Sequence, residues 1–187
     1  MTSDSSLWEL ATFYSLTNRQ EQALECVRRL AEMAQNPEQE SACYLAMGRL
    51  YEQLLDFPSA AQAYRRALSF SPKEPSTSYW ALNNLGFSLV KLGDPTQAVP
   101  LLRSAILVDP SRPNAFKNLG LALQYQGEIT SAAECFVLAT KANPGDTRSL
   151  RHLEELIETH PGLLLEMAGL RGELDACRKA VGTTNRR

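Results

Sequence analysis

Residues 41–72 read SACYLAMGRLYEQLLDFPSAAQAYRRALSFSP, and their spacing of apolar and small residues returns twice along the chain. Residues 79–110 read YWALNNLGFSLVKLGDPTQAVPLLRSAILVDP, and residues 113–144 read PNAFKNLGLALQYQGEITSAAECFVLATKANP. At matching offsets each stretch has a glycine, an alanine, an aromatic or leucine residue, and a closing proline. The last two copies start 34 residues apart, and a repeat of this length indicates a repeat architecture.

Each repeat predicts two helices joined by a short turn. Apolar residues at spacings of three and four line one face of a helix. The repeat glycines Gly48, Gly86 and Gly120 fall inside the first helix, where glycine is costly. We expect close approach of the second helix, at its repeat alanine, to compensate. The aromatic or leucine residue that follows would fill the space beside that contact, and the proline would end the second helix.

This pattern resembles the tetratricopeptide repeat, W-x2-L-G-x2-Y, then A-x3-F, then P, over about 34 residues. The resemblance implies an all-α fold, a right-handed α-solenoid of tandem helix-turn-helix repeats. The repeats lie at about 4–37, 41–74, 79–112 and 113–146, and a partial repeat with capping helices follows in 147–181. We expect one solenoid domain over residues 1–181 and a disordered tail at 182–187.

The spacing between repeats is uneven. Extra residues precede the second repeat, near Asn36-Pro37-Glu38, and the third, within Lys73–Ser78. They predict either longer loops or one extra helical turn before the next repeat. Beyond the fourth repeat we expect a helix at Arg148–Glu158 and a final helix from about Leu163 to Ala180.

Composition excludes several classes of protein. The 187 residues carry a net charge of −2, which gives no reason to expect nucleic acid or an anionic membrane as a partner. No apolar run approaches the length of a membrane-spanning helix, and the first residues lack the features of a signal peptide. The four cysteines are far apart, so we expect free thiols in a reducing cytoplasm, with a disulfide as the alternative.

No motif predicts an enzyme. The two histidines, His152 and His160, are eight residues apart and form no metal-binding pattern. The sequence has no phosphate-binding loop, dinucleotide fingerprint or nucleophile elbow. We therefore expect a non-catalytic protein without a cofactor or metal.

The resemblance implies that the first helix of each repeat lines a concave groove. In the first two repeats the groove positions are Trp8, Glu9, Thr12, Ala42, Leu45, Arg49 and Gln53. The C-terminal half of the groove is the predicted peptide-binding site. Its residues are Trp80, Asn83, Asn84, Phe87, Asn114, Lys117, Asn118, Tyr125, Arg148, Arg151 and His152.

Asn84 and Asn118 each lie two residues before a repeat glycine. This placement resembles the asparagine ladder of the O-linked N-acetylglucosamine transferase repeats, where such side chains hold the backbone of an extended peptide. A side-chain amide offers donors and an acceptor, as a peptide backbone does. The alternative is that these asparagines bond a neighbouring helix.

Charged and aromatic groove positions allow two interpretations. The cationic cluster, defined as Lys117, Arg148, Arg151 and His152, favours an acidic segment or a C-terminal carboxylate. The alternative is a solvated helix face with an Arg151–Glu155 pair. Likewise, Trp80, Phe87 and Tyr125 are either binding anchors or packing residues.

The sequence thus predicts an adaptor whose groove binds a peptide segment of a partner protein. The alternative is a self-associating scaffold subunit, which would use an exposed stripe of its last helix or its concave face. Neither interpretation requires nucleic acid or a membrane.

Overall fold

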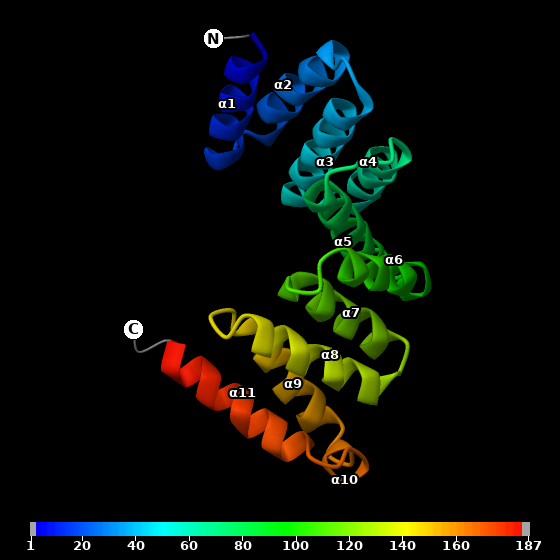
Figure 1. Cartoon of the computed structure of the whole chain (residues 1–187), viewed down its shortest axis with the longest axis vertical. Coiled ribbons are helices and arrows are strands. Elements are labelled where there is room, and N and C mark those ends of the chain that lie inside the picture. Colours follow the sequence, from blue (N-terminus) through cyan, green and yellow to red (C-terminus); the bar gives the residue numbers. More distant parts are fainter. Residues whose placement is uncertain (1–2, 185–187) are drawn as a thin grey trace. The chain divides into compact units, whose positions relative to one another are not determined.

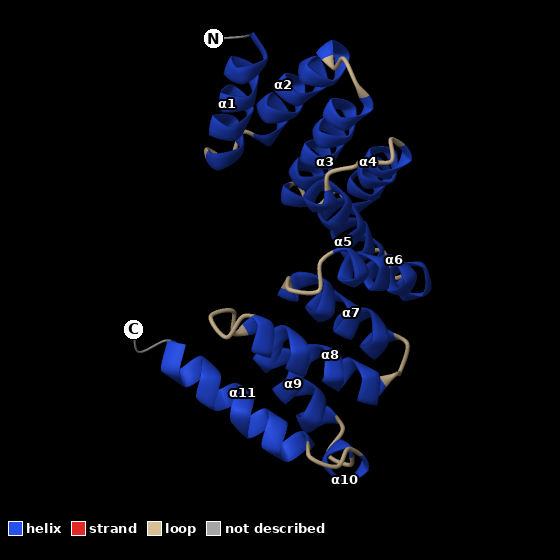
Figure 2. Cartoon of the chain, viewed as in Figure 1, coloured by secondary structure: helices blue, strands red, loops and turns tan. Residues whose placement is uncertain are grey.

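The computed structural model describes residues 3–184. In this part of the chain all regular structure is helical, and no strand occurs (Figure 2). The helices are α1 (Ser3–Leu16), α2 (Gln20–Met33), α3 (Pro37–Gln53), α4 (Phe57–Ser69), α5 (Pro75–Lys91), α6 (Pro95–Val108), α7 (Pro113–Tyr125), α8 (Ile129–Ala142), α9 (Arg148–Thr159), α10 (Leu163–Glu166) and α11 (Leu170–Thr184). The all-α fold class built from tandem helix pairs is confirmed.

The chain forms two compact units that divide after Asp94. In unit 1, α1 packs on α2, α2 on α3, α3 on α4, and α4 on α5 (Figure 1). In unit 2, α6 packs on α7, α7 on α8, and α8 on α9. Each unit therefore stacks consecutive antiparallel helices, as the repeat predicts. The single solenoid domain over residues 1–181 stays a prediction.

The repeat glycines make room for a ring rather than for the repeat alanine. A β-carbon on Gly48 would lie 2.6 Å from Cδ1 of Tyr64, and one on Gly120 would lie 2.6 Å from Cε1 of Phe136. Both rings are fully buried. The glycine thus allows the second helix to place its aromatic side chain directly on the backbone of the first.

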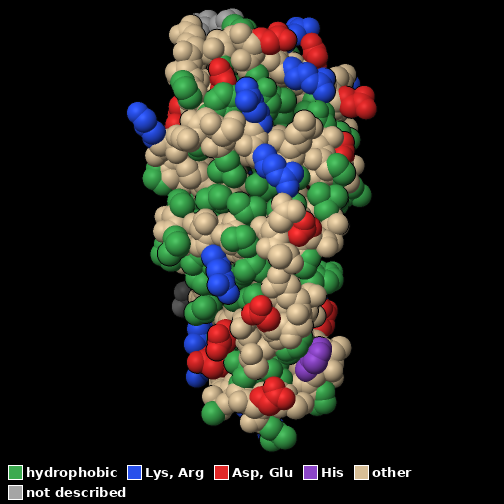
Figure 3. Space-filling model, turned by 90° about the vertical axis from the view of Figure 1, so that its right-hand side faces the viewer, with side chains coloured by type: hydrophobic (Ala, Val, Ile, Leu, Met, Phe, Trp, Pro, Cys, Tyr) green, Lys and Arg blue, Asp and Glu red, His purple; other side chains and the backbone are tan. Residues whose placement is uncertain are grey.

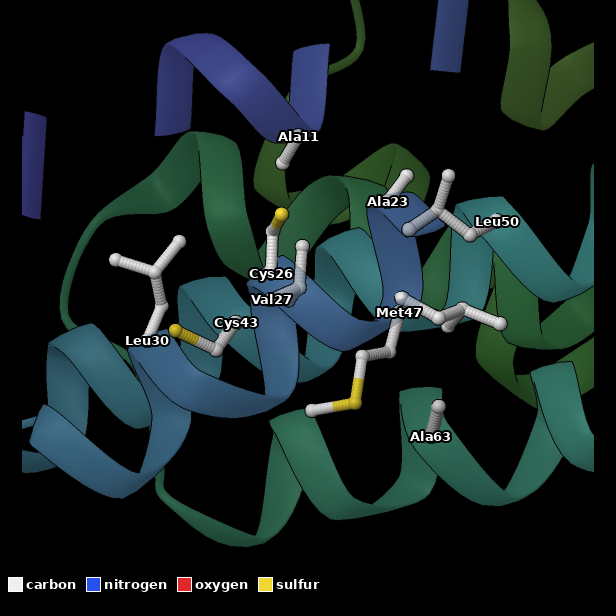
Figure 4. Packing of buried hydrophobic residues seen from close by; sticks show 10 residues of the cluster. Ala11, Ala23, Cys26, Val27, Leu30, Cys43, Met47, Leu50 and Ala63 are labelled. Carbon is white, nitrogen blue, oxygen red and sulfur yellow. The ribbon is translucent and has the colours of Figure 1, made fainter. Parts of the chain in front are cut away.

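The core of unit 1 joins the first four helices. Ala11 of α1 meets Cys26 and Val27 of α2, and Met47 of α3 points toward Ala63 of α4 (Figure 4). All four cysteines of the chain are buried and free, so the prediction of free thiols is confirmed. Burial raises the pKa of the Cys43 thiol to about 11, which keeps that thiol protonated and unreactive at neutral pH.

The extra residues between repeats lengthen the first helices. Both α3 and α5 have 17 residues, whereas α7 has 13. The additional turn begins with a proline in each case, at Pro37 and Pro75, where the missing N–H is harmless. The side chain of Asn36 caps α3 by accepting a hydrogen bond from the Gln39 backbone N–H, 3.0 Å away. Of the two expected arrangements, the extra helical turn is the one present.

The expected single C-terminal helix is interrupted. It divides into α10 and α11 because Gly169, with φ of +91°, turns the backbone into the left-handed region. The apolar stripe of α11, which includes Leu170, Leu174 and Cys177, is buried, and α11 packs on α8 and α9. It continues through Thr184, so the start of the expected disordered tail is helical. Residues 185–187 lie outside the described part.

Candidate functional site

Unit 1 has a hollow of about 400 Å³ between α1 and α3. This α1–α3 hollow is lined by Trp8, Ala11, Thr12, Ser15, Leu16, Val27, Ala42, Leu45, Ala46, Arg49, Leu50 and Gln53. Its wall is apolar along most of its length. Ser15 Oγ donates a hydrogen bond to Oε1 of Gln53, 3.1 Å away, and Arg49 supplies the positive charge among the lining residues.

The α1–α3 hollow includes the predicted groove positions of the first two repeats except Glu9. The sequence predicts Ala42, Leu45 and Arg49 as groove positions. It predicts the peptide-binding site in the C-terminal half of the groove, where asparagines and cationic residues are more frequent. The sequence carried no signal for a hollow at these positions, because they mix apolar residues such as Leu45 with polar ones such as Arg49. Only packing shows that they leave an open space.

Trp80 and Phe87, two of the predicted anchors, make ring contacts inside unit 1. The guanidinium carbon of Arg49 lies 5.2 Å from the centre of the Trp80 ring, and Phe87 meets Phe57 edge-on at 6.1 Å between centroids. Both side chains are half-buried. Both side chains therefore pack within the fold and also leave part of their surface exposed. This arrangement is compatible with a role as packing residues and with a role as binding anchors.

The amide of Asn84 is engaged within unit 1. Asn84 Nδ2 donates to the hydroxyl of Tyr64 at 3.3 Å, and Asn84 Oδ1 accepts from Nδ2 of Asn83 at 2.8 Å. Asn83 itself is only 2% exposed. Asn84 thus bonds a neighbouring helix, α4, which is the alternative to the ladder. To bind a peptide backbone, the Asn84 amide would have to give up its hydrogen bonds to Tyr64 and Asn83.

The hydrogen bonds of Asn83, Asn84 and Tyr64 continue to the half-buried carboxylate of Glu52. Glu52 Oε1 accepts a hydrogen bond from the Ser88 hydroxyl at 3.2 Å, and the Tyr64 hydroxyl also donates to the Glu52 carboxylate. Burial raises the pKa of Glu52 to about 7, although these two hydrogen bonds and the charge of Arg49 act in the opposite direction. Glu52 therefore titrates near neutral pH where α3, α4 and α5 meet.

Unit 2 brings Lys117 and Arg148, two members of the cationic cluster, into electrostatic contact. Burial lowers the pKa of Lys117, and the charge of Arg148 lowers it further while Asp146 partly opposes the shift. Arg148 Nη2 lies 2.6 Å from Oδ2 of Asp146. The bond from Arg148 is the main reason that the pKa of Asp146 falls to about 2. Asp146 thus neutralises part of the cluster.

His152 joins this cluster through its position on α9. Its ring stacks on the Phe136 ring at 5.4 Å between centroids, and Nδ1 lies 3.6 Å from Oε2 of Glu155. Burial lowers the pKa of His152, and the charges of Lys117 and Arg151 lower it further. In the described part of the chain Arg151 makes no ion pair, because Glu155 faces His152 instead.

The other predicted residues differ widely in exposure. Asn118 is 5% exposed, Asn114 is half-buried, and Tyr125 is 72% exposed. Trp80, Asn83, Asn84 and Phe87 belong to unit 1, whereas the remaining seven predicted residues belong to unit 2. The predicted set therefore divides into one group within each unit.

The described residues reveal neither a metal centre nor a membrane span. Between residues 3 and 184 no group of three or more His, Cys, Asp or Glu side chains could hold a metal ion. None of the helices in that range is both long enough and apolar enough to cross a bilayer.

Comparison with known proteins identifies the family. Sequence models described as "Tetratricopeptide repeat" match residues 83–147 and 41–74. Tetratricopeptide repeat protein 7A of Homo sapiens is 31% identical over 114 residues, which are 61% of this chain and 12% of that protein. Protein POLLENLESS 3-LIKE 2 of Arabidopsis thaliana is 27% identical over 152 residues, 70% of this chain and 35% of that protein. The chain belongs to the tetratricopeptide repeat family.

The relatives are longer proteins, since the chain spans 12% and 35% of the length of these two. Among solved structures, one of MamA superposes with a TM-score of 0.74 at 16% identity, covering 95% of this chain and 98% of that chain. MamA 41-end from Desulfovibrio magneticus RS-1 gives 0.69 at 18% identity, covering 100% and 96%. At these identities the likeness shows the fold alone.

Proposed function

We propose that the chain is a non-catalytic adaptor that binds a peptide segment of a partner protein on the face formed by its first helices. The α1–α3 hollow carries this proposal. It is an open apolar space of about 400 Å³ at groove positions of two successive repeats. Apolar pockets with a few convergent polar groups are the usual form of a binding site.

Two further observations support a peptide as the ligand. Arg49 lies at the hollow and also over the Trp80 ring, so a cation and an aromatic surface stand beside the apolar wall. In unit 2 the cationic cluster, taken by itself, offers a contact for an acidic segment. We propose the predicted set from Trp80 to His152 as contributing residues on these grounds.

Membership of the family supports an interaction module or scaffold rather than an enzyme. One relative, Superkiller complex protein 3 of Mus musculus, is 35% identical over 71 residues, which are 38% of this chain and 4% of that protein. Its name places it in a complex, which agrees with a role in protein assembly. The expected cytoplasmic location stays a prediction.

The test is to fill the hollow. Thr12 is exposed and lines it, so Thr12→Trp should block the space without disturbing the core. The matched control is Gln22→Trp, at an exposed position of α2 outside the hollow. Affinity capture with mass spectrometry should lose specific partners with the first variant and retain them with the second. Identical partner sets for both variants and the wild type would contradict the proposal.

Self-association is the second candidate, and one observation favours it. Leu10 and Phe13 of α1, which do not line the α1–α3 hollow, are 40% and 53% exposed, which is unusual for a terminal solenoid helix. The last helix no longer supports the idea, because its apolar stripe is buried within unit 2. Light scattering should show a concentration-dependent mass that falls in Phe13→Glu. A constant monomer mass would exclude this candidate.

A further inference from the structure

A second pocket of unit 1, of about 580 Å³, lies on α3 and α4. This α3–α4 pocket is lined by Tyr44, Met47, Tyr51, Ser59, Gln62, Ala63, Arg65, Arg66 and Ser69. The lining residues of α3 occupy different positions from those that face the α1–α3 hollow, so the two spaces do not share a wall residue. None of the lining residues is an acid.

The floor of this pocket is aromatic and apolar. Tyr44 lines the pocket and stacks on Phe70, which lies outside the lining, at 5.7 Å between centroids. Tyr51 also lines the pocket, and its hydroxyl accepts a hydrogen bond from Arg28 Nη2 at 3.3 Å. Met47 and Ala63, both buried, complete the floor. A large apolar side chain entering the pocket would therefore find close van der Waals contact.

The rim is cationic and held in place. The guanidinium carbon of Arg66 lies 4.6 Å from the centre of the Phe70 ring and 5.7 Å from that of Tyr44. Stacking of this kind fixes the plane of the guanidinium and leaves its N–H edge for an acceptor. Within residues 3–184 neither Arg65 nor Arg66 makes an ion pair with a carboxylate. In the upper half of Figure 3, Lys and Arg side chains accordingly lie among hydrophobic ones.

We propose that the α3–α4 pocket binds an acidic peptide segment of another protein that inserts one or two large apolar side chains. Charge complementarity selects this occupant. Carboxylates pair well with a planar guanidinium, and the apolar floor needs a side chain that a simple anion lacks. A nucleic acid fits the apolar floor less well, and the net charge of −2 would oppose it. This surface is additional to the proposed peptide-binding face and does not depend on it.

The experiment selects ligands without assuming a partner. A phage library of random 12-residue peptides is panned on the full chain, and the enriched peptides are synthesised for fluorescence anisotropy. We expect peptides that combine Asp and Glu with Leu, Ile or Phe, whose affinity falls as salt rises because the rim charges are exposed. Enrichment of neutral or basic peptides, or no enrichment, would overturn the proposal.

Three variants locate the binding site of those peptides. Arg65→Glu with Arg66→Glu reverses the rim, and Gln62→Trp fills the pocket without changing charge; each should weaken binding at least tenfold. Arg171→Glu with Lys179→Glu, at exposed positions of α11, makes the same change in net charge and should have no effect. Circular dichroism melting verifies that each variant folds.

Two experimental outcomes would assign the binding to another site or to another occupant. If binding survives Gln62→Trp but is lost in Thr12→Trp, the peptides occupy the α1–α3 hollow and the pocket proposal is wrong. If light scattering shows a self-associated wild type that becomes monomeric when the rim is reversed, the occupant is a second copy of this chain, and the proposed acidic partner is wrong.

Discussion

The ring of Tyr64 occupies the place that a β-carbon on Gly48 would need. Gly120 and Phe136 repeat this relationship in unit 2. Since both rings are fully buried, neither can swing away to admit an additional atom. Glycine is therefore required at this repeat position for steric reasons rather than for flexibility.

We expect Gly48→Ala and Gly120→Ala each to lower the free energy of unfolding by up to about 2 kcal/mol. Alanine favours a helix by roughly 1 kcal/mol, but forcing a methyl group against a buried ring costs about 1–3 kcal/mol. Urea denaturation measures the difference. The control is Gly172→Ala in α11, where a β-carbon would meet nothing within 4 Å, and this variant should be more stable than wild type. Stabilisation by all three would contradict the steric explanation.

Leu55→Gly should stabilise the protein by about 1 kcal/mol. Leu55 has φ of +59° and stands where the later repeats have Gly93 and Gly127, with φ of +78° and +79°. A left-handed conformation costs a residue with a β-carbon roughly 1–2 kcal/mol, and the Leu55 side chain is 73% exposed, so little packing is lost. Leu54→Gly is the matched control. Leu54 has φ of −81°, so that variant should not gain stability by thermal denaturation.

Glu52 should make stability depend on pH near neutrality. Its pKa is about 7 in the folded protein against an ordinary value of 4.5. Between these values the folded state holds a proton that the unfolded chain has released, so the free energy of unfolding falls as pH rises. Well above pH 7 Glu52 is ionised in both the folded and the unfolded state, so its contribution to the free energy of unfolding no longer changes with pH.

Glu52→Gln should therefore stabilise the protein by about 1–2 kcal/mol at pH 8 and change little at pH 5. The amide keeps an oxygen that accepts from Ser88 and Tyr64. Chemical denaturation at pH 5, 6, 7 and 8 provides the comparison. An equal effect at every pH would show that ionisation of Glu52 is not the cause.

Asn84→Ala should lower both stability and partner capture. The variant loses the bonds to Tyr64 and Asn83, which costs about 1–2 kcal/mol because their buried partners are left unmatched. Tyr64→Phe removes the same hydroxyl contact and should show a non-additive effect with Asn84→Ala. Additive losses in the double-mutant cycle would indicate that the two groups do not interact in solution.

The apolar stripe of α11, rather than its ion pairs, should hold that helix. Leu174 is 7% exposed, and Leu174→Ala should cost about 2–3 kcal/mol. Arg178 Nε lies 2.7 Å from Oε1 of Glu154 at the surface, and Arg178→Ala should cost less than about 1 kcal/mol. The reverse order, measured by urea denaturation, would mean that electrostatics anchors α11.

Much of the architecture was predictable because its signals are local. The glycine–alanine–aromatic spacing predicted the helix pairs, but it left open whether the extra residues before the second and third repeats form loops or the additional turn that begins α3 at Pro37 and α5 at Pro75. The break at Gly169 was missed because the apolar stripe from Leu163 to Cys177 continues across it, and helical periodicity alone does not reveal a left-handed residue.

The candidate site was predicted less completely. Sequence predicted groove positions, including Ala42, Leu45 and Arg49, but not that these residues surround an open hollow. Asn84 looked available to a peptide, although Tyr64, twenty residues earlier, accepts one of its hydrogens. The partner of a polar side chain depends on which helices pack together, and spacing within one helix carries no such information.

The sequence by itself determined the repeat, its helix pairs and the absence of familiar catalytic motifs, because each depends on residues close together in the chain. Only the tertiary structure decided which polar groups are consumed inside unit 1, which carboxylate titrates near pH 7, and where aromatic and cationic side chains leave pockets. Burial and hydrogen bonding are set by side chains from several helices at once, so these properties exist only after the helices have packed.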